Sequence, residues 1–119
     1  MKGKLHPIQI ARRVVEASGY LELGLTARAL EVLEPLPTEG PLAAPVLYLR
    51  GQAFRFEQRF DEAVAPLTAA AEQFPTPADR HVWMVLSHCQ FKSGHLNEAV
   101  DALAHARGAF VKPRPAPEN

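Results

Sequence analysis

The 119-residue chain is poor in the features that support cross-links, secretion or binding to charged polymers. It has one cysteine, which cannot close an internal disulfide, and its 13 basic residues balance 13 acidic ones. A net charge of zero leaves no electrostatic footprint for nucleic acid or for an anionic membrane. No apolar run approaches the ~20 residues of a membrane span, and the start MKGKLHPIQIARR has no apolar run long enough for a signal peptide. We therefore expect one cytoplasmic domain that binds neither nucleic acid nor membrane.

What the chain does contain is helical periodicity. In RHVWMVLSHCQFKSG, residues 80–94, Val82, Leu86 and Gln90 recur at four-residue steps, which is the spacing of a helix face. Gly94 is expected to end this helix, and a second helix is expected to begin near Leu96 or Asn97. The connection is so short that the two helices must form an antiparallel hairpin.

The same pattern occurs twice upstream. PVLYLRGQAFRFEQRFDEAVAPLTAAAEQFP and ARRVVEASGYLELGLTARALEVLEPLP each predict a helix, a turn and a helix. The alanines early in the second helices, Ala29, Ala63 and Ala99, are 34 and 36 residues apart. A period near 34 residues predicts helical hairpins that stack side by side, because none can bury its apolar face alone.

The repeated positions carry residues of a known motif, with large residues in the first helix, a small residue after them, and alanine and leucine in the second helix. The third unit offers Trp83, Leu86, Ser87, Gln90, Ala99, Leu103 and Ala106; the second offers Leu47, Arg50, Gly51, Phe54, Ala63, Leu67, Ala70 and Pro75; the first offers Ala17, Tyr20, Gly24, Ala29 and Leu33. The chain thus resembles the tetratricopeptide repeat (TPR) family and is similar to short bacterial TPR proteins. It departs from the motif at Arg13, Glu16 and Arg50, which stand at usually apolar positions.

The resemblance implies an all-α fold, a right-handed superhelical stack of three antiparallel helix hairpins. The repeats would span about residues 8–41, 43–76 and 77–111 of a single domain, 1–111. Pro35 and Pro37 are expected to shorten the second helix of the first unit, and Pro66 to bend the second helix of the middle unit without breaking it. Residues 112–119, KPRPAPEN, have no apolar periodicity and are expected to form a disordered tail.

Candidate catalytic and metal-binding residues gather in residues 81–89, but their spacing favours a structural role. His81 and His88 are seven residues apart, about 10.5 Å along a helix, too far to share one tetrahedral zinc. Cys89 points about 100° away from His88, so we expect a buried packing residue and not an activated thiolate. No phosphate loop, paired-carboxylate site or nucleophile elbow is present. We expect no catalysis, metal or cofactor; a metal-dependent enzyme using the histidines is the alternative.

Function must then come from a surface. The resemblance implies that the first helices of the hairpins line a concave groove that binds a protein or peptide. The residues expected to line it are Tyr48, Gln52, Arg55, Phe56, His81, Met84, His88, Phe91 and Lys92. The same stripe begins at Pro45 in the second unit and runs through Ala11, Val14, Ser18 and Leu21 in the first. Arg55 and Lys92 would hold a carboxylate, and the histidines would add positive charge as the pH falls from about 7.5 to 6, because imidazole titrates near 6.5.

Two other functions remain open at this stage. The chain leaves little sequence after residue 110 for a capping helix, so Val100, Ala104, Phe110 and Val111 could be covered by a homodimer, which would make the protein a self-associating scaffold. Its length and repeat number also permit a small secretion-type chaperone or adaptor.

Overall fold

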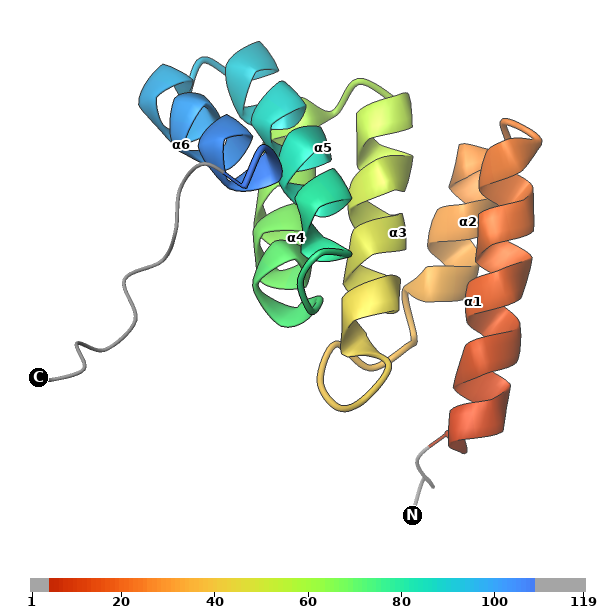
Figure 1. The fold of residues 1–119 in the computed structure, drawn as a ribbon. Coiled ribbons are helices and arrows are strands. Elements are labelled where there is room, and N and C mark those ends of the chain that lie inside the picture. The colour runs from red at the N-terminus through yellow and green to blue at the C-terminus, as the bar shows by residue number, and fades with distance from the viewer. Residues whose placement is uncertain (1–4, 109–119) are drawn as a thin grey trace, which may run out of the picture.

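A computed structural model describes residues 5–108, and within this range the regular secondary structure is all α-helix, with no strand. The six helices follow one another with short connections (Figure 1). They are α1 (Pro7–Glu22), α2 (Thr26–Leu33), α3 (Ala43–Phe56), α4 (Phe60–Gln73), α5 (Asp79–Lys92) and α6 (Leu96–Ala106). The predicted all-α class is confirmed. None of these helices is long and apolar enough to cross a membrane.

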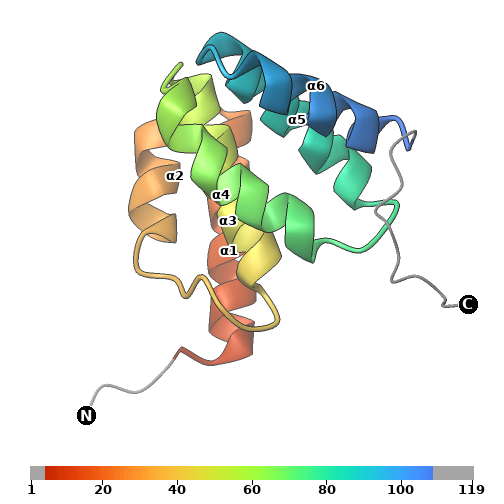
Figure 2. The same ribbon diagram turned by 90° about the vertical axis from the view of Figure 1, so that its left-hand side faces the viewer.

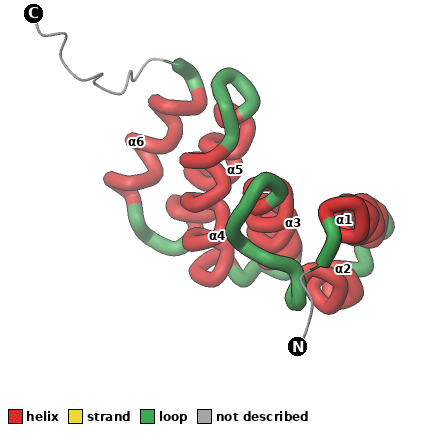
Figure 3. The backbone as a smooth tube through the Cα atoms, turned by 90° about the horizontal axis from the view of Figure 1, so that it is seen from below, coloured by secondary structure: helices red, strands yellow, loops and turns green. Residues whose placement is uncertain are grey.

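The helices pack as three consecutive pairs. α1 packs against α2, α3 against α4 and α5 against α6, and the pairs are joined by contacts of α2 with α3 and of α4 with α5. The first helices also contact one another in order, α1 with α3 and α3 with α5. Figures 2 and 3 show this succession from two further directions, and α1 and α6 lie at opposite ends of the molecule (Figure 1).

The turn inside each pair has the same backbone form. One residue takes a left-handed conformation: Gly24 with φ 78°, Gln58 with φ 62° and Gly94 with φ 85°. The N–H of the next residue donates to the carbonyl five residues back, and the bonds join Leu25 to Tyr20, Arg59 to Phe54 and His95 to Gln90, each at 2.8 Å. This bond and the left-handed residue are the marks of a Schellman motif, which ends one helix and reverses the chain into the next.

The aligned alanines occupy equivalent places. Ala29, Ala63 and Ala99 are each the fourth residue of their helix, and all are buried. The small residues of the first helices are also buried at equivalent positions: Ala17, Gly51 and Ser87. At Gly51 an added Cβ would overlap the side chain of Leu67 on α4. The small side chain is therefore required for the approach of α3 to α4.

The departures from the repeat motif have physical reasons. Arg50 Nη2 donates to the carbonyls of Leu33 at 3.0 Å and Glu34 at 2.8 Å, so it satisfies the end of α2 instead of filling a core. α2 needs such a partner because it stops after eight residues, as the following prolines predicted. Arg13 and Glu16 are exposed on α1.

Two expectations concern single segments. α4 runs unbroken through Pro66, as predicted. Residues 1–4 and 109–119 lie outside the described part of the chain, so the predicted tail 112–119, and Phe110 and Val111 with it, are not placed. The repeat boundaries remain predictions.

The left-handed residue in the turn of each hairpin leads to a prediction about stability. Gly94→Ala should lower the free energy of unfolding by about 1–2 kcal/mol, because a side chain disfavours the left-handed conformation and no atom lies within 4 Å to add a clash. Gln58→Gly should raise it by up to about 1 kcal/mol, since the same strain is removed and only part of the gain is offset by backbone entropy.

Urea unfolding followed by circular dichroism measures both changes. Gly19→Ala is the matched control: Gly19 lies within α1 with open space around a Cβ, so alanine should stabilise the helix by about 1 kcal/mol. A Gly94→Ala protein as stable as the parent would contradict the assigned turn.

Candidate functional site

The candidate site is the surface formed by the first helices α1, α3 and α5. Two adjoining hollows of about 470 and 280 Å³ lie between α1 and α3, and both border Tyr48 and Leu49 of α3. Of the residues predicted for the groove, Tyr48, Gln52 and Phe56 line these hollows. The predicted residues of α5 do not line them.

The expected stripe also included Val14, Ser18 and Leu21 of α1 and Pro45 of α3, and all four line the hollows. The lining residues that were not expected are Val15, Gly19 and Glu22 of α1, Leu49 of α3, and Phe74 at the end of α4. The repeat register is the signal that identified Val14 and Ser18, which stand where Tyr48 and Gln52 stand in the second unit. No such signal was available for Phe74, because it follows a second helix.

Tyr48 connects the elements of this surface. Its hydroxyl accepts a hydrogen bond from Gln52 Nε2 at 2.7 Å and lies 3.0 Å from His81 Nε2 on α5. Its ring meets Phe74 edge-on at 6.2 Å, and burial raises the pKa of the phenol. Tyr48 is therefore half-buried and holds α3, α4 and α5 together, and only part of it remains available to a ligand.

Positive charge gathers next to Tyr48. Arg55 Nε donates to Gln52 Oε1 at 2.7 Å, and neither Arg55 nor Lys92 forms an ion pair with a carboxylate among residues 5–108. Burial lowers the pKa of His88, and the nearby positive charges of Arg55 and Lys92 lower it further. Its ring also meets Phe60 of α4 edge-on at 5.6 Å. The lowered pKa corrects the expected pH range, since His88 gains its charge at a lower pH than an ordinary histidine.

Large apolar side chains are exposed beside these cations. Phe56, Met84 and Phe91 have 47%, 51% and 63% of their surface exposed. The guanidinium carbon of Arg55 lies 4.9 Å from the centre of the Phe56 ring, so charge and apolar surface are in direct contact. Arg55, Phe56, His88, Phe91 and Lys92 all belong to the second halves of α3 and α5.

Cys89 and Trp83 have structural roles. The side chain of Cys89 is fully buried, and burial raises the pKa of its thiol to about 11, so the thiolate is not populated at neutral pH. Trp83 Nε1 donates to Asp79 Oδ2 at 3.1 Å, and its ring stacks on His105 of α6 at 4.1 Å. No group of three His, Cys, Asp or Glu side chains within residues 5–108 is placed to hold a metal ion.

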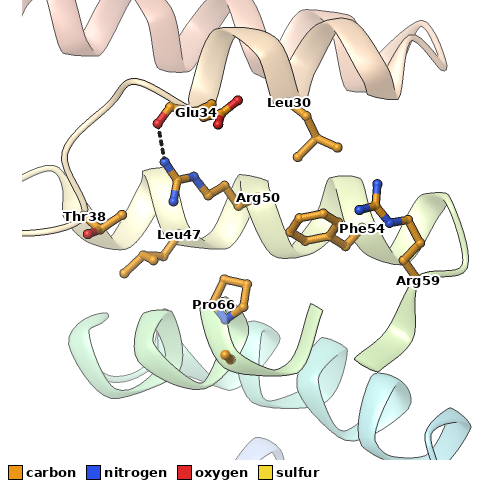
Figure 4. A pocket seen from close by; sticks show the side chains of 9 residues that line it. Leu30, Glu34, Thr38, Leu47, Arg50, Phe54, Arg59 and Pro66 are labelled. Atoms are coloured by element: carbon orange, nitrogen blue, oxygen red, sulfur yellow. Dashed lines mark hydrogen bonds between the residues drawn. The ribbon is translucent and has the colours of Figure 1, made fainter. Parts of the chain in front are cut away.

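A larger cleft of about 590 Å³ opens between α2, α3 and α4 (Figure 4). Its walls include Leu30, Phe54 and Pro66, and its two cations already have partners. Arg50 donates to the carbonyls at the end of α2, while Arg59 pairs with Glu57 at 2.9 Å and Glu62 at 2.6 Å and lies over the ring of Phe54. The cleft therefore offers apolar surface with little unpaired charge.

The ion-pair cluster of Glu57, Arg59 and Glu62 also links the first hairpin to the turn of the second. Thr26 Oγ1 donates to Glu57 Oε2 at 2.7 Å, joining the start of α2 to the turn between α3 and α4. This hydrogen bond, followed by the one from Arg59, lowers the pKa of Glu57, and the Arg59 hydrogen bond lowers the pKa of Glu62. The carboxylates are thus held in their charged form for a structural purpose.

No protein-family model matches the chain, and no curated protein matches it in sequence. The assignment of function therefore depends on the surface itself.

The environment of Cys89 predicts its reactivity. A thiol-specific reagent such as dithionitrobenzoate should leave the native protein unmodified at pH 7.5 and label one thiol after unfolding in urea, because a buried thiol of raised pKa supplies almost no thiolate. Val85→Cys, at a second buried position of α5, is the matched control and should give two thiols after unfolding. Rapid labelling of the folded protein would mean that Cys89 is accessible and that its packing role is wrong.

Proposed function

We propose that this chain is a non-catalytic protein-interaction module of the TPR type, which binds a peptide or protein segment along the face of α1, α3 and α5. In this proposal the three hairpins form a right-handed superhelical stack, and the first helices line its concave side. The shared turns and the equivalent alanines support the repeat, and the contacts among α1, α3 and α5 place the first helices next to one another.

The observation that carries the proposal is that cations without a carboxylate partner among the described residues lie beside exposed apolar side chains. Arg55 and Lys92 are the cations near His88, Arg55 lies over the ring of Phe56, and the exposed Phe91 stands three residues after His88 on the same side of α5. Apolar side chains contribute about 25 cal/mol per Å² of surface buried, before the costs of association. Unpaired cations contribute mainly orientation and specificity. The ligand that fits is a segment with an acidic group next to large apolar residues.

The two hollows between α1 and α3 extend this surface. Their walls are mostly apolar, and Met84 on α5 is a flexible side chain that adapts to irregular partners. A bound segment could therefore place its acidic group near α5 and its apolar side chains along α3 toward α1. A secretion-type chaperone or adaptor would use the same surface, and the chemistry of the ligand is the same in both cases.

Truncation of the exposed anchors should weaken this binding. A peptide selected from a phage-displayed random library against the purified protein should combine Asp or Glu with Leu, Phe or Ile. Met84→Ala with Phe91→Ala should weaken that peptide about tenfold or more, since each buried anchor contributes about 1 kcal/mol. Arg55→Gln with Lys92→Gln should weaken it less, and the difference should shrink at high salt.

Fluorescence polarisation of the labelled peptide measures these affinities. Leu23→Ala is the matched control, because Leu23 is 73% exposed in the first turn and lies outside the site. If the aromatic and methionine side chains can be removed from a folded protein with no loss of affinity, the peptide binds elsewhere.

Binding of an acidic peptide should also depend on pH. The pKa of His88 is lowered in the free protein, and a bound carboxylate favours its charged form, so binding takes up a proton. Affinity should therefore rise as the pH falls, and the rise should continue down to the lowered pKa of free His88, which lies below the ordinary imidazole value of about 6.5.

Polarisation titrations at pH 7.5, 6.5 and 5.5 test this sign and range. His88→Gln should flatten the rise between pH 6.5 and 5.5. His6→Asn, which keeps the cap at the start of α1, should not change it. A rise that persists unchanged in His88→Gln would assign the proton to another group.

A further inference from the structure

The last helix presents an apolar stripe that nothing covers in the described part of the chain. Leu96 and Val100 of α6 have 55% and 66% of their surface exposed. By the repeat register they stand where Phe60 and Val64 stand on α4. These two residues of α4 are half-buried, because α5 packs on that side of α4.

The other two hairpins show which helix covers the equivalent residues of α4 and α2. Phe60 meets the ring of His88 on α5, and Val64 packs against the cluster that contains Val85. On α2 the equivalent of Val64 is Leu30, which packs against the cluster that contains Leu49 of α3. In both cases a second helix is covered by the first helix of the next hairpin.

The first helix presents the matching surface at the other end. Ile8 and Val15 of α1 are 58% and 71% exposed. Val15 stands where Leu49 stands on α3 and Val85 on α5, and these are only 9% and 7% exposed because a preceding hairpin covers them. The two exposed surfaces are therefore the two halves of one contact that the chain already makes twice.

We propose that the protein associates head to tail, with α1 of a second copy packing on α6 as α3 packs on α2 and α5 on α4. The small residue needed at a close helix crossing is present, since Gly19 stands where Ala53 and Cys89 are buried. Because α1 and α6 lie at opposite ends of the molecule, such a contact is heterologous and continues into open chains of copies (Figure 1). The contact shares Val15 and Gly19 with the hollow between α1 and α3, but it does not involve the exposed side chains Phe56, Met84 and Phe91 of the peptide-binding surface.

A symmetric pairing of two α6 helices is the competing arrangement. The internal packing disfavours it, because within residues 5–108 no second helix contacts another second helix; each contacts only first helices. The head-to-tail contact should be weaker than the internal ones. Arg12 of α1 stands at the position where α3 and α5 bury Val46 and Val82, so a charged side chain replaces an apolar one. We therefore expect association that grows with concentration.

The experiment uses two double variants that each block one end. Ile8→Glu with Val15→Glu blocks α1, and Leu96→Glu with Val100→Glu blocks α6; all four side chains are exposed, so circular dichroism melts should show folded proteins. Sedimentation velocity of the parent chain, from micromolar to millimolar concentration, should give a mass that rises beyond two chains. Each blocked variant alone should remain a monomer.

Mixing the two blocked variants gives the decisive result. Each has one intact end, so the equimolar mixture should form dimers and nothing larger, although neither variant associates alone. Phe91→Glu is the control for an added charge at an exposed apolar residue and should associate like the parent chain. Loss of association in Phe91→Glu would place the contact on the peptide-binding surface and overturn the proposal.

Two other outcomes would also overturn it. A parent chain that stays monomeric at every concentration would mean that the stripes on α1 and α6 do not meet. If the variant blocked at α1 still forms dimers while the variant blocked at α6 does not, the contact is a symmetric pairing of α6 helices.

Discussion

The structure depends on how closely the two helices of each hairpin approach each other. At Gly51 there is no space for even one additional carbon atom beside Leu67, and the equivalent residues of the other first helices are also small and buried. The approach brings the buried alanines of the second helices against the first helices and leaves the larger residues to fill the gaps between hairpins. The Schellman turn fixes the reversal of the chain, so spacing and direction are set locally, within about 30 residues, before any hairpin meets the next.

The contacts between hairpins are of a different kind. They combine the apolar packing of Leu30 and Val64 on the next hairpin with a few polar side chains that cross between hairpins. These polar contacts run from Arg50 to the end of α2, from Thr26 to Glu57, and from Tyr48 to His81. These groups also shape the surfaces available to other molecules. Tyr48 divides the face of the first helices into hollows near α1 and a cationic region near α5, and the short α2 opens the cleft on the other side.

The sequence was sufficient to predict the helices and their pairing into three hairpins, because these follow from local periodicity and from a spacing that recurs. Glycine marked two of the three turns, but Gln58 takes the same left-handed conformation without such a signal. The arrangement of the candidate site was harder to predict. Arg50 and Arg59 have partners for their charge, whereas Arg55 and Lys92 have no carboxylate partner among the described residues. This difference depends on where the ends of neighbouring helices lie in space. The same is true of Phe74, which enters the surface only because Tyr48 packs against it.

The shortness of α2 has a consequence for how the molecule fluctuates. With eight residues against fourteen in α4, α2 buries less surface, and the end of α2 is held by one guanidinium from the next hairpin. In a stack where each hairpin contacts only its neighbours, local opening begins at the unit with the fewest such contacts. The first hairpin is therefore the unit that separates most readily, and its separation would widen the hollows between α1 and α3 while α5, with the cationic region, stays folded. Ligand entry near α1 and charge recognition near α5 would then take place on parts of the molecule with different mobility.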